Sequence, residues 1–266
     1  MPKVSLFHIG PQKSGTTWVY KALQEHPEIE CPPKDTIHYF DMYYYRGEEW
    51  YHGFFDTNLT RFDPTPSYIR SPWAAERIHR YNPEAKIILC LREPIERAFS
   101  HCWHEKKKGK YNFEFSEVFS NYDLYSSWLE PGFYGRQLEK FLNYFPREQI
   151  LCLTFDELQA DPGKYLSKVY AFAGLSDTQF TPSVLEKKVN EAKPKQTFYT
   201  RLLKKPLKKL RLKGLANDLG KGEYNRGLAP EIQKELYKMV KPEIEYTEAV
   251  ARIDLTHWKK KYEDLL

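Results

Sequence analysis

The feature that most constrains the fold of this chain is an apolar run that leads directly into a glycine loop and a helical pattern. Residues Val4–Ile9 are predicted to form a buried strand, and apolar residues recur at helical spacing from Thr16 to His26. The loop between them begins at Gly10 and contains Gly15. Glycines permit a tight turn with backbone N–H groups facing a ligand, and the next helix points its positive N-terminus to the same place. This pattern predicts an anion site.

The loop, Gly10-Pro-Gln-Lys-Ser-Gly15, is related to the Walker A pattern GxxxxGK[ST] but departs from it. The two glycines have the Walker spacing, yet Thr16 stands at the lysine position and the lysine lies inside the loop, at Lys13. The usual lysine for a β/γ-phosphate pair is therefore missing. We predict a phosphate loop of a different kind.

A second anion site is predicted after the apolar run Lys86–Leu91, which is the clearest buried strand in the sequence. In an open α/β sheet, ligands bind at the carboxyl ends of the strands, and Arg92 stands at such an end. Ser100 lies on the helix that follows, where its hydroxyl could share one anion with the Arg92 guanidinium. Two separate anion sites on one sheet suggest a ligand that carries two separated phosphate-type groups.

Strands that alternate with helices along the chain predict an α/β fold, with one central parallel sheet covered by helices on both faces. A length of 266 residues fits a single domain. Residues 27–37 are rich in proline and are predicted to be a loop. We expect strands at Val4–Ile9, Arg61–Asp63, Lys86–Leu91 and Gln149–Phe155, and helices at Thr16–His26, Pro72–Tyr81, Pro94–Gly109, Tyr134–Phe145, Pro162–Ala173 and Pro230–Val240.

Charge and composition narrow the class of protein. With 41 Lys+Arg against 36 Asp+Glu, the net charge of +5 permits an anionic ligand but does not require nucleic acid. Four scattered cysteines without a CxxC pair indicate free thiols in a reducing compartment, and the eight histidines lack metal-ligand spacing, so we expect no metal. No apolar run approaches the ~20 residues that span a bilayer, and the N-terminal run is too short for a signal peptide. We therefore expect a cytoplasmic protein without a transmembrane segment.

At the two anion motifs the sequence resembles the sulfotransferases that use 3′-phosphoadenosine 5′-phosphosulfate (PAPS). Gln12–Trp18 resembles the family's 5′-phosphosulfate loop, and Leu91–Ser100 resembles its 3′-phosphate motif. The similarity is closest to the carbohydrate branch that includes heparan sulfate sulfotransferases, since Thr36–Asp41 and Thr65–Tyr68 are similar to further motifs of that branch. The resemblance covers most of residues 3–175 and thins out afterwards.

The resemblance implies a P-loop-like sulfotransferase fold in one domain that spans residues 1–266. The core, residues 1–175, holds both donor motifs, and residues 176–266 hold a basic segment (187–213), a nucleotide-covering loop and C-terminal helices. Lys13 is implied to stabilise the leaving 5′-phosphate, without a metal. The implied donor-binding residues are Gln12, Lys13, Ser14, Gly15, Thr16, Thr17, Trp18, Arg92, Ser100, Phe198, Tyr199, Lys221, Gly222 and Arg226.

Two positions depart from the branch pattern. Thr36 replaces the acidic residue that is usually taken as the catalytic base, and Pro64 replaces a lysine before the Thr-Pro motif. His38 is our first candidate for the base, since the ordinary imidazole pKa of about 6.5 suits proton abstraction at neutral pH. Asp35 and Asp41 are the alternatives, and Asp41 could instead orient His38.

The expected activity is transfer of the sulfuryl group of PAPS to a hydroxyl acceptor, above all a carbohydrate or glycolipid, with adenosine 3′,5′-bisphosphate (PAP) as the second product. Aromatic residues crowd Tyr39–Phe55, where they could stack on sugar faces, although most are expected to fill the core. The alternatives are sulfonation of a phenol, lipid or natural-product alcohol, a phosphate-loop kinase, and a non-catalytic polyanion-binding protein that uses the basic segment.

Overall fold

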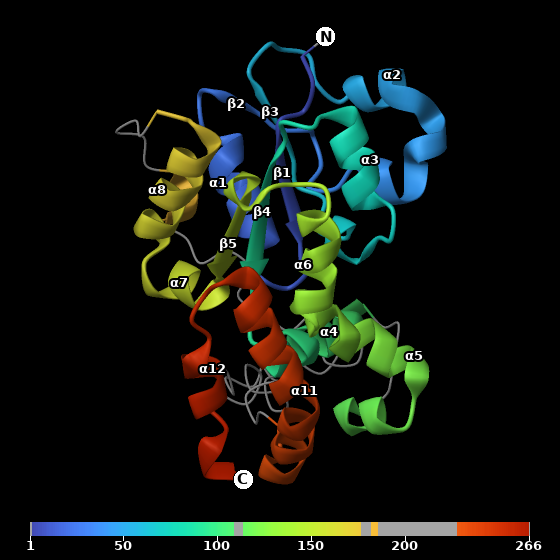
Figure 1. The fold of residues 1–266 in the computed structure, drawn as a ribbon, viewed down its shortest axis with the longest axis vertical. Helices are drawn as coiled ribbons and strands as arrows, with labels where there is room; N and C mark the ends of the chain where they lie inside the picture. The colour runs from blue at the N-terminus through green and yellow to red at the C-terminus, as the bar shows by residue number, and fades with distance from the viewer. Residues whose placement is uncertain (1, 109–113, 177–181, 186–227, 266) are drawn as a thin grey trace, which may run out of the picture.

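The computed structural model describes residues 2–108, 114–176, 182–185 and 228–265 of the chain. Its centre is a sheet of five parallel strands in the order β2-β3-β1-β4-β5 (Figure 1). Because the strands are parallel, their carboxyl ends share one edge of the sheet, and the predicted α/β fold is confirmed. The strands are β1 (Leu6–Gly10), β2 (Ile29–Glu30), β3 (Thr60–Asp63), β4 (Lys86–Leu91) and β5 (Ile150–Thr154).

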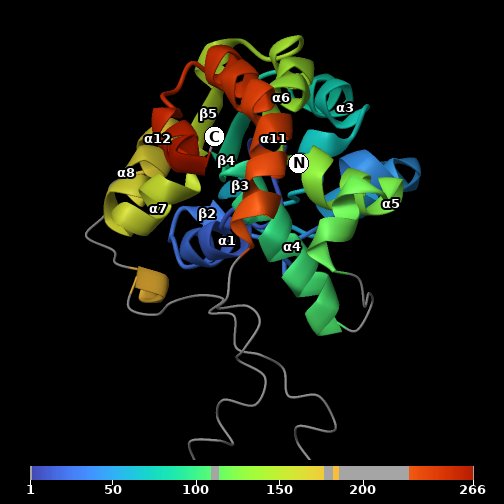
Figure 2. The same cartoon turned by 90° about the horizontal axis from the view of Figure 1, so that it is seen from below.

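Both faces of the sheet are buried, because alternate side chains of the central strands enter two different cores. Phe7 and Ile87 belong to the larger core, whereas Leu6 and Ile88 belong to the smaller one. Figure 2 shows the two layers of helices on either side of the sheet. The larger core is covered by α3 (Ala74–Tyr81), α4 (Pro94–Lys108), α6 (Tyr134–Leu142) and α11 (Pro230–Ala251), and the smaller one by α1 (Thr16–Gln24), α7 (Phe155–Ala160) and α8 (Pro162–Ala173).

Shorter elements complete the structure. Two of them are π-helices, η1 (Tyr39–Tyr43) and η5 (Tyr125–Leu129). A 3₁₀ turn, η3 (Tyr68–Arg70), follows the Thr-Pro motif. The structure also contains the short helices α2 (Gly47–His52), α5 (Tyr122–Leu124) and α12 (Thr256–Lys260).

Most of the predicted elements exist with small differences at their ends. The strand Lys86–Leu91 and the helix Pro162–Ala173 have the predicted bounds. The first strand begins later than predicted, at Leu6, and the first helix ends at Gln24 rather than at His26. The ends of helices and strands depend on caps and local contacts. The sequence therefore predicts them less well than the interior of an element, where apolar residues recur at regular spacing.

Two predictions about elements are wrong. The proline-rich segment 27–37 is predicted to be a loop, but it contains β2, whose Ile29 pairs with Thr60 of β3. The helix predicted at Pro230–Val240 continues to Ala251, through Pro242. In both cases a contact distant in sequence outweighs a local signal against regular structure.

Packing against α6 explains why α11 continues past its proline. Pro242 removes one backbone N–H donor, which normally ends or bends a helix. Beyond it, however, Ile244 is fully buried in the larger core, and Thr247 Oγ1 accepts a hydrogen bond from the N–H of Gly135 at 3.0 Å. A Cβ atom at Gly135 would lie 3.2 Å from the Thr247 nitrogen, so glycine allows the two helices to approach this closely.

The aromatic segment Tyr39–Phe55 mainly fills the larger core, as expected. Tyr39 and Tyr51 stack with ring centroids 4.5 Å apart, and Phe40 is fully buried. Tyr45, in contrast, is 78% exposed. The buried rings anchor the segment that carries the candidate base.

The structure also bears on the expected free thiols and on the expectation about transmembrane segments. Cys31, Cys90, Cys102 and Cys152 are all free thiols. Of the helices in the described ranges, none combines the length and the apolar character needed to cross a membrane.

Candidate functional site

The predicted donor loop connects β1 to α1 through three backbone positions in the left-handed region. Gly10 has a φ of 118°, Lys13 of 73° and Gly15 of 88°. A Cβ atom at Gly10 would lie 2.1 Å from the carbonyl oxygen of Pro66, and one at Gly15 would lie 2.7 Å from Leu158 Cδ2. Glycine alone fits both positions without a shift of these neighbours, which explains the spacing of the two glycines.

The loop ends at the N-terminus of α1, where Gly15 is the N-cap and no side chain caps the first N–H groups. Ser14 Oγ is buried and has no hydrogen-bond partner among the described residues. Leaving a buried hydroxyl without a hydrogen-bond partner costs about 1–3 kcal/mol of stability. An unpartnered hydroxyl of this kind is therefore expected where a ligand supplies the missing partner. The loop therefore presents helix-terminal N–H groups and a hydroxyl in the arrangement that binds an anion, and the residues present fit a phosphate.

Arg92 follows β4 and contacts the donor loop directly. Its Nη1 donates to the Lys13 carbonyl oxygen at 3.1 Å, although the two residues are 79 positions apart. Arg92 Nη2 lies 3.5 Å from Glu96 Oε2, and the guanidinium carbon lies 4.7 Å from the centroid of the Phe155 ring. Ser100 is half-buried on α4. The fold thus brings the two predicted phosphate motifs together at the carboxyl edge of the sheet.

A buried carboxylate follows Arg92 in the chain and caps α4. Glu93 accepts hydrogen bonds from the N–H groups of Ile95 at 2.9 Å and Glu96 at 2.8 Å, and from the Tyr262 hydroxyl at 2.8 Å. Burial raises the pKa of Glu93 to about 7, although these hydrogen bonds act in the opposite direction. The second anion motif is therefore tied to the C-terminal part of the chain.

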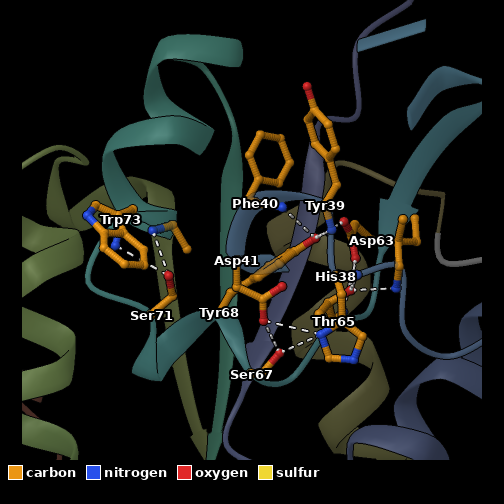
Figure 3. A network of polar contacts seen from close by, with 12 residues as sticks. His38, Tyr39, Phe40, Asp41, Asp63, Thr65, Ser67, Tyr68, Ser71 and Trp73 are labelled. Carbon is orange, nitrogen blue, oxygen red and sulfur yellow. Dashed lines mark hydrogen bonds and ion pairs between the residues drawn. The ribbon is translucent and has the colours of Figure 1, made fainter. Parts of the chain in front are cut away.

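His38, Asp41 and Ser67 point toward one another and form a triangle of contacts (Figure 3). His38 Nδ1 lies 3.2 Å from Asp41 Oδ2 and 3.1 Å from Ser67 Oγ, and Ser67 Oγ donates to Asp41. The hydrogen bond with Asp41 raises the pKa of His38. Burial alone would raise the pKa of Asp41, but hydrogen bonds from His38 and Ser67 lower it. The pair therefore favours an imidazolium beside a carboxylate.

A buried carboxylate at the end of β3 organises the chain around His38. Asp63 accepts hydrogen bonds from the hydroxyl groups of Tyr51 at 2.8 Å, Tyr68 at 2.9 Å and Thr65 at 2.6 Å. Burial raises the pKa of Asp63, and these hydrogen bonds oppose the rise. Asp63 is absent from the candidates predicted from the sequence, although its position at the carboxyl end of a predicted strand was an available signal.

The same network fixes the backbone on either side of His38. Thr65 Oγ1 accepts from the N–H of Ile37 at 2.9 Å, and the Tyr68 hydroxyl accepts from the N–H of Tyr39 at 3.0 Å (Figure 3). His38 itself has a φ of 60°, a conformation that few residues adopt without such support. The Thr-Pro motif therefore positions the backbone of the candidate base segment.

The three base candidates have different surroundings. Asp35 Oδ2 accepts a hydrogen bond from Thr17 Oγ1 at 3.2 Å, so this carboxylate lies against the first turn of α1. His38 and Asp41 instead pair with each other. Asp35 is half-buried, as is His38.

The other predicted donor residues are placed as follows. Gln12 is exposed, and Thr16 and Trp18 are half-buried; the Trp18 ring packs edge-on against that of Tyr165 at 6.4 Å. Within the described ranges, no group of three or more His, Cys, Asp or Glu side chains could hold a metal ion. Phe198, Tyr199, Lys221, Gly222, Arg226 and the basic segment 187–213 lie outside the described residues.

Known proteins are similar to this chain in sequence. The mouse bifunctional heparan sulfate N-deacetylase/N-sulfotransferase 4 is 31% identical over 217 residues, which are 73% of this chain and 24% of that protein. The mouse heparan sulfate glucosamine 3-O-sulfotransferase 6 is 31% identical over 175 residues, which are 63% of this chain and 51% of that protein. This chain thus spans 24% of the length of the first relative and 51% of the second. These relatives confirm the predicted resemblance to the carbohydrate branch.

Solved structures share the fold. A sulfotransferase from Alicyclobacillus acidocaldarius has a TM-score of 0.73 over 97% of this chain and 100% of that chain, at 24% identity. A mouse sulfotransferase complexed with PAP has a TM-score of 0.55 over 98% of this chain and 88% of that chain, at 16% identity. The family model described as "Sulfotransferase domain" matches residues 4–244, a range that includes both anion motifs. The chain therefore belongs to the sulfotransferase family.

Proposed function

We propose that the protein transfers a sulfuryl group from PAPS to a hydroxyl or amine group of a carbohydrate acceptor. The observation that carries the proposal is the hydrogen bond from Arg92 to the Lys13 carbonyl oxygen, because it unites two phosphate motifs at one edge of the sheet. The names of the heparan sulfate sulfotransferases support a carbohydrate as the acceptor class.

Each end of the donor has its own set of residues in this proposal. The Ser14 hydroxyl and the N-terminal N–H groups of α1 hold the 5′-phosphate end, while Arg92 and Ser100 hold the 3′-phosphate. When bound, PAPS supplies an activated sulfuryl group with a phosphate as its leaving group. Negative charge builds on the leaving oxygen in transfers of this kind, so the Lys13 ammonium stabilises it.

For the acceptor proton we assign Asp35 as the base. Its carboxylate contacts Thr17 in the first turn of α1 and so lies beside the donor loop. His38, the first candidate from the sequence, has its Nδ1 engaged by Asp41 and Ser67, and its raised pKa favours the protonated ring, which cannot accept a proton. His38 then donates a hydrogen bond to the acceptor, and Asp41 orients it.

The first test is donor binding and turnover. PAP should raise the melting temperature, since a ligand at 100 times its Kd stabilises a fold by about 2.7 kcal/mol. Lys13→Ala should lower kcat about 100-fold or more with radiolabelled PAPS and a heparan-type oligosaccharide, because it removes a cation from the transition state. Lys34→Ala, an exposed lysine in the following loop, serves as the control. Near wild-type turnover by Lys13→Ala would contradict this mechanism.

The assignment of the base has its own test. Asp35→Asn keeps the shape of the side chain but cannot accept the proton, so kcat should fall by about 10²–10⁴-fold. His38→Gln should lose less than Asp35→Asn. The reverse pattern, with the larger loss in His38→Gln, would return the role of the base to His38.

A further inference from the structure

Lys261, the residue that follows α12, reaches back to the start of α4. Its ammonium group forms an ion pair with Oε1 of Glu96, which lies in the first turn of that helix. The other carboxylate oxygen, Glu96 Oε2, lies 3.5 Å from Arg92 Nη2. Glu96 is therefore shared between two cations, one from the second anion motif and one from the C-terminal segment.

Arg92 is the less exposed of these two cations. Its side chain is 17% exposed, against 48% for that of Lys261. A guanidinium with little access to water interacts strongly with a neighbouring carboxylate, because solvent and salt screen the pair less. The charge of Glu96 therefore weakens the positive potential that Arg92 presents to an anion, and the charge of Lys261 offsets this effect.

The contact between Glu96 and Arg92 is a loose ion pair. Its 3.5 Å exceeds the distance of about 2.7–2.9 Å that is typical of charge-assisted N–H···O hydrogen bonds. Arg92 Nη1, at the other end of the guanidinium, donates to the Lys13 carbonyl oxygen in the donor loop. The guanidinium is thus held against the donor loop, and a phosphate oxygen at hydrogen-bond distance would lie closer to Nη2 than Glu96 does.

Contacts of its neighbours fix the position of Lys261. The Tyr262 hydroxyl donates to Glu93 at 2.8 Å, and the buried Tyr262 ring stacks on that of Tyr237 with the ring centroids 5.0 Å apart. Trp258, three residues before Lys261, is buried as well. The backbone at Lys261 is therefore anchored, so the ion pair with the carboxylate orders only the side chain.

We propose that Lys261 is a positioning residue for the 3′-phosphate of the donor. By holding Glu96 at Oε1, Lys261 offsets the carboxylate charge that faces Arg92, so that the guanidinium charge acts on the phosphate. This inference rests on the sulfotransferase function proposed above, and it adds a residue outside both anion motifs to the donor site. Lys261 acts through Glu96 and has no contact with the nucleotide in this proposal.

The test compares two nucleotides that differ in the 3′-phosphate. PAP carries this group and adenosine 5′-monophosphate (AMP) lacks it, so the ratio of their affinities reports on the 3′ end. In calorimetric titrations at low salt, Lys261→Ala should weaken PAP binding about 3–10-fold and leave AMP binding within about 2-fold, as expected for the loss of one partly exposed charge. An equal loss for both nucleotides would mean that Lys261 supports the whole site, and it would overturn the proposal.

A double-mutant cycle with Glu96 shows how Lys261 acts. Glu96→Gln removes the negative charge but keeps the shape of the side chain, so it should bind PAP at least as tightly as the wild-type protein. In the Glu96→Gln background, Lys261→Ala should change PAP binding by less than about 2-fold, since no carboxylate charge is left to offset. An equal loss in both backgrounds would mean that Lys261 acts on the nucleotide directly. That result, or weaker PAP binding by Glu96→Gln alone, would refute the positioning role.

Two further variants serve as controls. Lys261→Arg keeps the charge and should bind PAP within about 2-fold of the wild-type protein. Lys260→Ala removes an exposed lysine next to Lys261 and should leave the affinities for PAP and AMP unchanged. If Lys261→Ala binds PAP as tightly as the wild-type protein does, this inference fails and the sulfotransferase function stands. If the wild-type protein itself does not bind PAP, the proposed function fails, and this inference fails with it.

Discussion

At the scale of single residues, Asp63 and Glu93 illustrate how a buried carboxylate shapes a loop. Asp63 accepts hydrogen bonds from Tyr51, Tyr68 and Thr65, and Glu93 accepts three from its own helix start and from Tyr262. A carboxylate in the core is tolerated only where donors surround it. Each of these two therefore joins chain segments that are separate in sequence, and each lies next to a predicted functional segment.

Glu93 is expected to make stability depend on pH. Burial raises its pKa from 4.5 to about 7, so the native state binds this proton more tightly than the unfolded chain does. The contribution of Glu93 to the stability of the fold is largest below about pH 4.5, and it is lost as the pH rises through about 7. The free energy of unfolding should therefore fall by roughly 3 kcal/mol over that interval on account of Glu93.

Urea denaturation at about pH 5 and about pH 8 measures this change. Glu93→Gln removes the titrating group, so its free energy of unfolding should change much less between the two conditions than that of the wild-type protein. Glu76→Gln, at an exposed position on α3, should behave as the wild type does. The same pH dependence in Glu93→Gln and the wild type would show that another group is responsible.

The sequence predicts those residues of the candidate site that follow the end of a strand. Lys13 and Arg92 each follow a buried run, and parallel strands bring such positions to one edge. The partners of Asp63 were not predictable, because Tyr51 and Tyr68 meet it only inside the folded core. The contact of Asp35 with Thr17 likewise depends on the path of the intervening chain, so the sequence left the base open between three residues.

At the scale of elements, the loops after β1 and β3 pack backbone against backbone. The Gly10 Cα lies so close to Pro66 that a side chain there would meet the Pro66 carbonyl oxygen at 2.1 Å. The first loop is the predicted donor loop, and the second supports the segment that contains His38. The geometry of the donor site and that of the candidate base segment therefore depend on each other.

Gly10→Ala should disturb both loops. Its φ of 118° disfavours a side chain, and the new Cβ would clash with backbone rather than with a flexible side chain. Gly47→Ala is a matched control, since Gly47 has a φ of 80° but a Cβ atom there would have nothing within 4 Å. Backbone strain alone costs about 1–3 kcal/mol, so Gly47→Ala should lose that much and Gly10→Ala more.

Urea denaturation and calorimetric titration with PAP measure the two effects. Only Gly10→Ala should weaken PAP binding, because only its clash reaches the donor loop. If the two variants lose the same stability and bind PAP equally well, the contact with Pro66 does not support the loop.

Elements with a clear period were predictable, and elements held by distant contacts were not. The strand Lys86–Leu91 and the helix Pro162–Ala173 have strong local patterns, and both have the predicted bounds. The π-helix at Tyr39–Tyr43 begins where the Tyr68 hydroxyl accepts the Tyr39 N–H, a contact that no local pattern encodes. The C-terminal half of α11 depends in the same way on its packing against α6.

At the scale of the whole molecule, the C-terminal helices return to the sheet edge that holds the candidate site. Figure 1 shows α11 and α12 beyond the carboxyl ends of β4 and β5. Trp258 Nε1 donates to Asp156 Oδ2 at 2.8 Å, and the Tyr262 hydroxyl donates to Glu93. These contacts connect the C-terminal helices to the segments that follow β4 and β5, so the site depends on the completed fold.

Trp258→Ala should reveal how much this docking contributes. Trp258 is 2% exposed in the larger core, and its loss would leave a cavity and remove the hydrogen bond to Asp156. Truncation of a buried tryptophan costs about 3–5 kcal/mol. Urea denaturation measures the loss, and Met239→Ala, at a position on α11 that is 39% exposed, is the control. A cost below about 1 kcal/mol would mean that the C-terminal helices dock only weakly.

The two motifs of the proposed nucleotide site are in direct contact, since Arg92 donates a hydrogen bond to the Lys13 carbonyl oxygen. In our proposal the site binds a phosphate at each end of the nucleotide. Both phosphates are still present after the sulfuryl group has been transferred. In this proposal PAP therefore keeps most of the contacts that held PAPS, and we expect the release of PAP to limit the rate of the cycle. A rapid-quench experiment should then show an initial burst of sulfated acceptor close to the enzyme concentration, and strong inhibition by accumulated PAP.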